Sequence, residues 1–129
     1  MAKNYTLNCN LSMTATSASG YSQSQSGSYT LNITGVDQIA TGRIDVAHDG
    51  DSTVMAAPGS GRFIYVKNLD DTNFVKIYDG ASSAADLIGI LEPGHFLMTV
   101  IRGTGTTVAL ADTATVTIEY AAIEIDANA

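Results

Sequence analysis

The side chains that could take part in covalent or metal chemistry are few, because the 129-residue chain has one cysteine and two histidines. Cys9, His48 and His95 are the candidates for an activated nucleophile or a soft metal site, and both kinds of site need such groups at characteristic spacings. These residues stand on separate segments without that spacing. Cys9 alternates in phase with apolar neighbours, which is typical of a small buried side chain, and His95 follows a Pro-Gly turn, where we expect an exposed loop. We therefore predict no catalytic residue among them.

Aspartates offer a second kind of chemistry, the binding of calcium. Residues 45–51 loosely resemble the start of a calcium-binding loop, but Ala47 and Ala56 stand where that loop needs an oxygen ligand. This mismatch excludes an EF-hand. A looser metal site formed by Asp49 and Asp51 stays open, although paired aspartates in turns more often hydrogen-bond the turn backbone.

Asp70 and Asp71 form another acidic pair, which could bind a metal or act as the acid and base of a small hydrolase. Adjacent residues on a strand or turn point apart, so these two carboxylates cannot flank one scissile bond. We expect them to form a turn. The chain as a whole is predicted to be no enzyme, with no cofactor and no metal.

The charge balance disfavours two classes of partner. Thirteen acidic and six basic residues give a formal charge of −7, which repels the phosphates of nucleic acids. No apolar run approaches the roughly 20 residues that span a bilayer, and no basic amphipathic segment is present. We expect no nucleic-acid or membrane partner. A single cysteine and a polar start without a signal peptide favour synthesis in a reducing cytoplasm.

The first structural element predicted from the sequence is a segment of alternating apolar and polar residues. Residues 5–13 alternate apolar with polar side chains, which predicts a half-buried strand. Residues 14–28 are rich in Ser and predict a loop or flexible hairpin tip. Residues 29–34 alternate again and predict a strand that pairs antiparallel with the first. We expect residues 1–129 to form a single β-sandwich domain, in which residues 1–13 are an N-terminal strand or arm.

The plainest pattern lies in the middle of the chain. Two β-rich apolar runs at residues 63–66 and 74–78 flank turn-forming residues at 68–73, which predicts a hairpin. Its inward positions are the strongest core candidates of the chain. They are Ile64, Val66, Val75 and Ile77.

Weaker patterns complete an all-β fold. They predict short strands over residues 43–46, 52–55, 87–91, 96–101, 107–110 and 114–125. Residues 92–95 read Glu-Pro-Gly-His, with Pro and Gly where a type II turn needs them. No segment has helical periodicity over three turns. About eight to ten short strands at regular spacing indicate an antiparallel β-sandwich, with a jelly-roll-like arrangement as one form of it.

The polar positions of the N-terminal strands carry Thr, Ser and Asn in place of charged residues, as at Thr30 and Asn32. A weakly charged, hydrogen-bonding face is suited to docking against another protein. An ordinary solvated sheet face explains the pattern equally well, because Thr is favoured in strands for steric reasons. Both interpretations stay open.

Residues 62–77 resemble a hairpin that recurs in small virion structural proteins of tailed bacteriophages, and residues 91–98 resemble its companion. In those proteins a strand ending in an Asn-Leu-Asp turn precedes an Asn-aromatic-Val strand, then a Pro-Gly turn and an apolar strand. The same order stands here at residues 68–70, 73–75 and 93–94. The N-terminal part resembles them only in style, with a polar-alternating strand followed by a Ser-rich segment.

The resemblance implies a non-enzymatic β-sandwich that serves as a capsid decoration (cement) protein on the virion surface, after synthesis in the host cytoplasm. The implied partners are the major capsid protein and further copies of the chain, as a trimer that bridges capsomers and stabilises the head. The alternatives are a tail or neck component, or a carbohydrate- or host-surface-binding module. The absence of Trp and the scattering of six Tyr give a glycan-stacking platform little support.

Overall fold

The computed structural model describes residues 3–16, 22–36, 39–55, 61–80, 82, 86–102 and 105–125. These ranges contain ten strands and no helix, which confirms the predicted all-β class. The strands are β1 (Lys3–Thr16), β2 (Ser22–Val36), β3 (Ile39–Val46), β4 (Ser52–Met55), β5 (Gly61–Asn68), β6 (Val75–Asp79), β7 (Asp86–Leu91), β8 (Phe96–Arg102), β9 (Thr107–Ala111) and β10 (Val116–Ile125).

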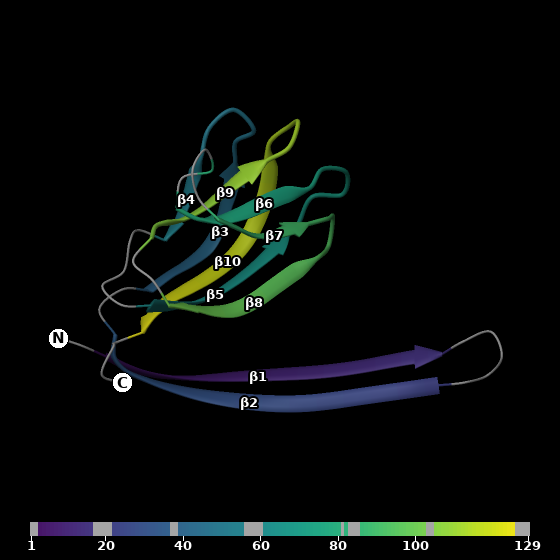
Figure 1. The fold of residues 1–129 in the computed structure, drawn as a ribbon, viewed down its shortest axis with the longest axis vertical. Coiled ribbons are helices and arrows are strands. Elements are labelled where there is room, and N and C mark those ends of the chain that lie inside the picture. Colours follow the sequence, from purple (N-terminus) through teal and green to yellow (C-terminus); the bar gives the residue numbers. More distant parts are fainter. Residues whose placement is uncertain are drawn as a thin grey trace.

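Two four-stranded antiparallel sheets form the sandwich, with the strand orders β3-β10-β5-β8 and β4-β9-β6-β7. The pairing is nested around the middle of the chain: β6 pairs with β7, β5 with β8, β4 with β9, and β3 with β10. Successive nested pairs alternate between the two sheets, which is a jelly-roll arrangement. Figure 1 shows the two sheets stacked face to face.

The core lies between the sheets. Ile64 and Val66 on β5, and Val75 and Ile77 on β6, occupy alternate positions and are fully buried, while Lys76 between the last two is partly exposed. The predicted core residues are therefore confirmed. They belong to one cluster with Val46, Val54, Leu91, Ala109, Ala111, Val116, Ile118 and Ala122.

The predicted central hairpin is wrong in its pairing, because β5 and β6 belong to different sheets. β5 lies between β8 and β10, whereas β6 lies between β7 and β9. Residues 69–74 therefore cross the sandwich. Crossing sets the apolar sides of both strands face to face across the core, where a hairpin would set the strands side by side in one sheet. The local sequence pattern is the same for the two arrangements.

Residues 92–95 form the predicted type II turn. The N–H of His95 donates to the carbonyl of Glu92 at 2.9 Å, and Gly94 has a φ of +79°, the left-handed conformation that this turn requires and that glycine adopts without strain. This connection also crosses between the sheets, since it joins β7 to β8.

Asn68 holds the two crossing connections together. Its buried side-chain amide donates to the carbonyls of Asn73 and Leu91, both at 2.9 Å, and its side-chain oxygen accepts from the N–H of Asp70 at 2.8 Å. Its backbone N–H donates to the carbonyl of His95 at 2.9 Å. One side chain at the end of β5 thus satisfies backbone groups of both connections.

Asn68→Ala is expected to destabilise the fold, because leaving a buried polar group without its partner costs about 1–3 kcal/mol and this change removes three hydrogen bonds. Urea unfolding followed by circular dichroism should show a lower midpoint. Thr72→Ala, an exposed change in the same connection, is the matched control and should stay within about 0.5 kcal/mol of the wild type. An unchanged midpoint for Asn68→Ala would contradict the role given to its side chain.

β1 and β2 form a separate two-stranded sheet, here called the hairpin arm (residues 3–16 and 22–36). The predicted antiparallel pairing of the two alternating segments is confirmed by register pairs. Three of them are Tyr5 with Ile33, Leu7 with Leu31, and Cys9 with Tyr29. Figure 1 shows the arm running alongside the sandwich from the end where β3 begins and β10 ends, and extending past β8.

The loop predicted over residues 14–28 is wrong for most of its length. β1 continues to Thr16 and β2 starts at Ser22, with Thr14 opposite Ser24. A strand pair is held by backbone hydrogen bonds, so polar Ser, Thr and Gln residues can extend it as long as their N–H and C=O groups find partners across the ladder. Residues 17–21 lie outside the described part of the chain.

Candidate protein-interaction surface

The outward face of the β3-β10-β5-β8 sheet carries exposed apolar side chains. Because Ile64 and Val66 point into the core, alternate residues of β5 and their register partners point outward. On β8 these partners are Phe96, Met98 and Val100. They are 53%, 42% and 46% exposed, respectively, and we call them the β8 stripe.

One end of this outward face is covered. Phe63 on β5 and Ile123 on β10 face each other in the register and are only 8% and 5% exposed, yet neither belongs to the core cluster between the sheets. β2 of the hairpin arm also contacts β10, the strand that carries Ile123. Val100, the register partner of Phe63 on β8, is 46% exposed, so the buried part of this face ends before it.

The other end of the outward face is polar. The hydroxyl of Tyr65 donates to Glu119 at 3.1 Å, and Arg43 lies 3.7 Å from the same carboxylate. Desolvation, together with the hydrogen bond and charge of Glu119, raises the pKa of the Tyr65 phenol. The Tyr65 ring also lies 6.4 Å from that of Phe96. Tyr65 therefore lies between the polar side chain of Glu119 on β10 and the β8 stripe.

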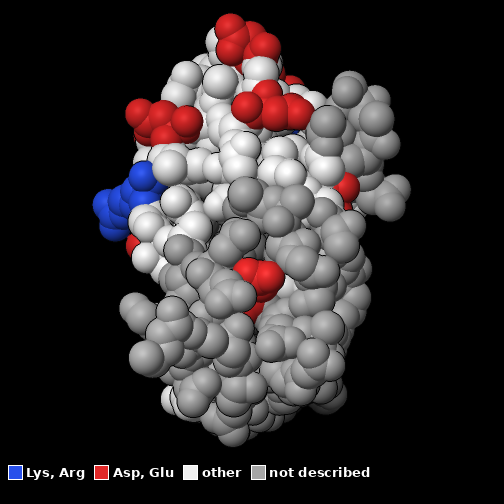
Figure 2. Space-filling model, turned by 90° about the vertical axis from the view of Figure 1, so that its left-hand side faces the viewer, with Lys and Arg blue, Asp and Glu red and all other residues white. Residues whose placement is uncertain are grey.

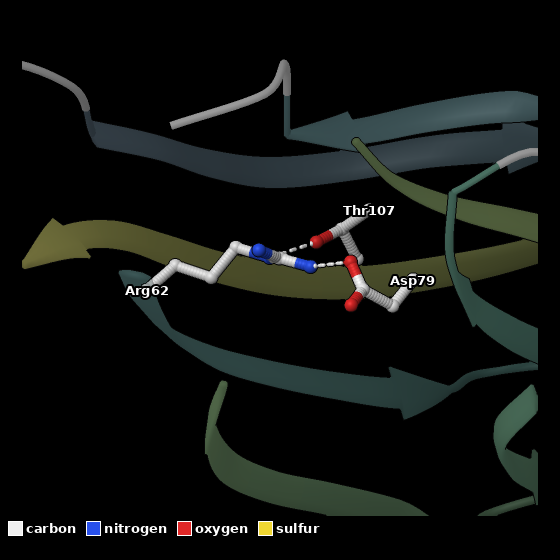
Figure 3. A network of polar contacts seen from close by, with 3 residues as sticks. All are labelled: Arg62, Asp79 and Thr107. Carbon is white, nitrogen blue, oxygen red and sulfur yellow. Dashed lines mark hydrogen bonds and ion pairs between the residues drawn. The ribbon is translucent and has the colours of Figure 1, made fainter. Parts of the chain in front are cut away.

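A buried arginine joins the two sheets at one end of the sandwich. Arg62 on β5 has no exposed surface; its Nε donates to the hydroxyl of Thr107 on β9, and its Nη2 pairs with the carboxylate of Asp79 on β6 (Figure 3). A Cβ added to Gly105 would lie 2.5 Å from Asp79 Oδ1, so glycine leaves room for this carboxylate. The charges of the arginine and the aspartate neutralise each other, and the contacts of this network link the two sheets.

The structure places the candidate chemical residues on different elements. Cys9 lies in the hairpin arm, His48 is exposed between β3 and β4, and His95 is exposed between β7 and β8. The predicted exposed position of His95 is confirmed. Among the described residues, no group of three or more His, Cys, Asp or Glu side chains could hold a metal ion.

The carboxylates of Asp70 and Asp51 accept hydrogen bonds from backbone N–H groups of turns and loops. Asp70 accepts from the N–H groups of Asn73 and Thr72 at 2.6 and 3.0 Å, and these hydrogen bonds lower the pKa of its carboxyl, that from Asn73 most. The pKa of Asp51 is lowered by hydrogen bonds from the side chain and the backbone N–H of Ser82. The predicted turn-forming role of Asp70 is thereby confirmed.

Acidic side chains gather at the opposite end of the molecule from the root of the arm. Figure 2 shows several of them at its upper end, which Figure 1 identifies with the β3–β4 and β9–β10 connections, and others lower on the same face. Asp49, Asp51 and Asp112 are exposed in these connections. The β8 stripe is uncharged by comparison.

Sequence reasoning missed both the β8 stripe and the Arg62 network. The signal for the stripe was the nearly continuous apolar run of residues 96–101, which leaves apolar side chains on both faces of one strand. Arg62 gave no such signal, because a single arginine beside an apolar run looks the same whether it faces solvent or the core.

No helix in the described part of the chain is long and apolar enough to cross a membrane. A scan against protein-family models, a search of curated proteins and a search of solved structures each found no match for this chain.

Proposed function

We propose that this protein is a non-enzymatic virion structural protein, a capsid decoration protein that stabilises the head of a tailed bacteriophage. The resemblance of residues 62–77 and 91–98 to small virion proteins supports the proposal. So does the jelly-roll arrangement, which recurs in viral capsid proteins, although a fold alone does not determine a function.

The observation that carries the proposal is that two surfaces of this protein lie outside the core between the sheets. The β8 stripe is apolar and about half exposed, and the hairpin arm forms a sheet of its own with Thr6, Asn8 and Asn10 exposed on its polar side. The candidate catalytic side chains, in contrast, lie on separate elements.

In the proposed mechanism, copies self-associate as trimers and bridge neighbouring capsomers through the polar side of the arm and through loop tips. Each contact with the major capsid protein is modest. Several contacts made at once give a much stronger attachment, because the later ones form at high effective concentration. The bridged capsomers then resist the pressure of the packaged genome.

Cosedimentation with empty heads tests the proposal. The wild type should bind and saturate, and the variants Cys9→Ala, His48→Ala and His95→Ala should bind equally well because none of these groups takes part. Replacing the polar side chains of Thr30 and Asn32 by Leu, at positions opposite Asn8 and Thr6, should weaken binding at least about tenfold, equivalent to about 1.4 kcal/mol.

Two results would overturn the proposal. One is binding to tail tubes or to a glycan without binding to heads, which would support the alternative virion locations. The other is loss of head binding after a change of His48 or His95 alone, which would reveal a chemical site at that residue.

A further inference from the structure

We infer that the apolar side of the hairpin arm in one copy binds the β8 stripe of a second copy. The inference rests on the self-association proposed above, and these two surfaces form the contact between copies. It gives the two sides of the arm different partners, with the polar side facing the capsid and the apolar side facing a neighbouring copy.

The β8 stripe remains uncovered by the protein's own arm. Phe96, Met98 and Val100 keep 42% to 53% of their surface exposed with the arm in place. They occupy alternate positions of β8, the last strand at one edge of its sheet. Contiguous exposed apolar side chains of this kind mark binding surfaces in soluble proteins.

The arm itself requires support from another surface. Its strands are 14 and 15 residues long, and an isolated two-stranded hairpin is marginally stable in water. Its register sets apolar residues opposite one another: Tyr5 with Ile33, Leu7 with Leu31, and Cys9 with Tyr29. Residues directly opposite share one side of a strand pair, so these apolar positions of the sequence fall on one side of the arm, and the exposed Thr6, Asn8 and Asn10 fall on the other.

The outward face is already buried at one end. Phe63 and Ile123 on this face are buried, and β2 of the arm contacts β10, which carries Ile123. The same face continues directly to Val100, the register partner of Phe63. A second arm seated on the β8 stripe would extend this covered surface along the strand.

Charge favours a second copy as the occupant. Lys3 is the only charged residue before Asp37, so the five remaining basic residues stand against all thirteen acidic residues in the rest of the chain. Two acidic sandwiches repel each other when they approach directly. An uncharged arm that reaches an uncharged stripe lets the copies associate while their acidic ends stay apart.

The contact joins two different surfaces, so each copy can give an arm and receive one. Such head-to-tail contacts generate a closed ring when the rotation between copies closes, and the proposed trimer is a ring of this kind. Residues on either surface should therefore affect assembly without affecting the fold of the sandwich.

Sedimentation equilibrium of the purified full-length protein measures the assembly. The wild type should be a trimer, and Met98→Glu on the stripe and Leu7→Glu on the arm should each give monomers, with the dissociation constant raised at least about 30-fold, as for a central interface residue. Ile90→Glu is the matched control, since Ile90 is 48% exposed but pairs with Lys76 on the other sheet. It should assemble like the wild type, and all three variants should keep a cooperative thermal unfolding transition.

Mixing the two monomeric variants is the sharper test. Leu7→Glu keeps an intact stripe and Met98→Glu keeps an intact arm, so a mixture should form one good contact per pair and yield dimers that cannot close. A wild-type monomer, a trimeric Met98→Glu variant, or a mixture that stays monomeric would each overturn the inference.

Head binding is scored separately in the same variants. Trimers that fail to bind heads would contradict the proposed function and leave the arm contact standing. Wild-type protein that binds heads as a monomer would contradict the arm contact and leave the function standing.

Discussion

Val75→Asp is expected to unfold the protein. Val75 has no exposed surface and lies in β6 between β7 and β9, facing the core. Burying an unpaired carboxylate there costs several kcal/mol even after its pKa adjusts, against a total stability of about 5–15 kcal/mol for a typical domain. Far-UV circular dichroism should show loss of the β spectrum and of a cooperative thermal transition.

Lys76→Asp provides the matched control on the same strand. Lys76 points away from the core, with its ammonium 5.7 Å from the Phe74 ring centre, so its replacement should cost no more than about 1 kcal/mol, the usual size of an exposed cation–π contact. A thermal midpoint that Val75→Asp leaves unchanged would show that the core does not lie where the structure places it.

Arg62→Met should produce the next largest loss of stability. The change leaves the carboxylate of Asp79 and the hydroxyl of Thr107 without the arginine that bonds them, and breaking a buried ion pair from one side costs about 3–5 kcal/mol. Since the Asp79 side chain keeps 28% of its surface exposed and can take up water, we expect a value at the lower end of that range. Urea unfolding measures it.

A double variant separates the loss of the ion pair from the loss of packing. Arg62→Met combined with Asp79→Leu removes both charges, and replacing both partners of a buried pair by apolar groups is often close to neutral. The double variant should therefore be more stable than Arg62→Met alone. If the double variant instead lost the sum of the stabilities lost by Arg62→Met and by Asp79→Leu alone, the pairing of Arg62 with Asp79 would not be what holds the sheets together at this end.

In the proposed assembly, the hairpin arm makes the contacts between copies and the sandwich holds the arm in place. An arm that forms its own sheet can be altered without opening the core cluster, which is why the assembly variants are expected to stay folded. The buried polar groups support this view of the sandwich: among the described residues, every buried side-chain nitrogen or oxygen has a hydrogen-bond partner.

Local physical chemistry made part of this fold predictable. The β-rich apolar runs of residues 63–66 and 74–78 identified β5 and β6, and the two-residue period around Lys76 identified Val75 and Ile77 as core residues, because burial alternates along a strand. The Glu-Pro-Gly-His turn followed from the fixed φ of Pro93 and the left-handed φ that Gly94 accepts. The turn formed by Asp70 followed from the reach of a short carboxylate to the next N–H groups.

The sequence by itself thus determined the class of the fold, most strand positions and the inward side of the central strands, since each depends on a few neighbouring residues. Only the tertiary structure decided which sheet each strand joins, how far the arm extends, that Arg62 faces inward and that Phe96 and Met98 face outward. These outcomes depend on partners far along the chain, such as the pairing of Ile64 with Ala122. A local pattern carries no information about such partners, because the free energy that selects them arises when the two sheets close over a shared core.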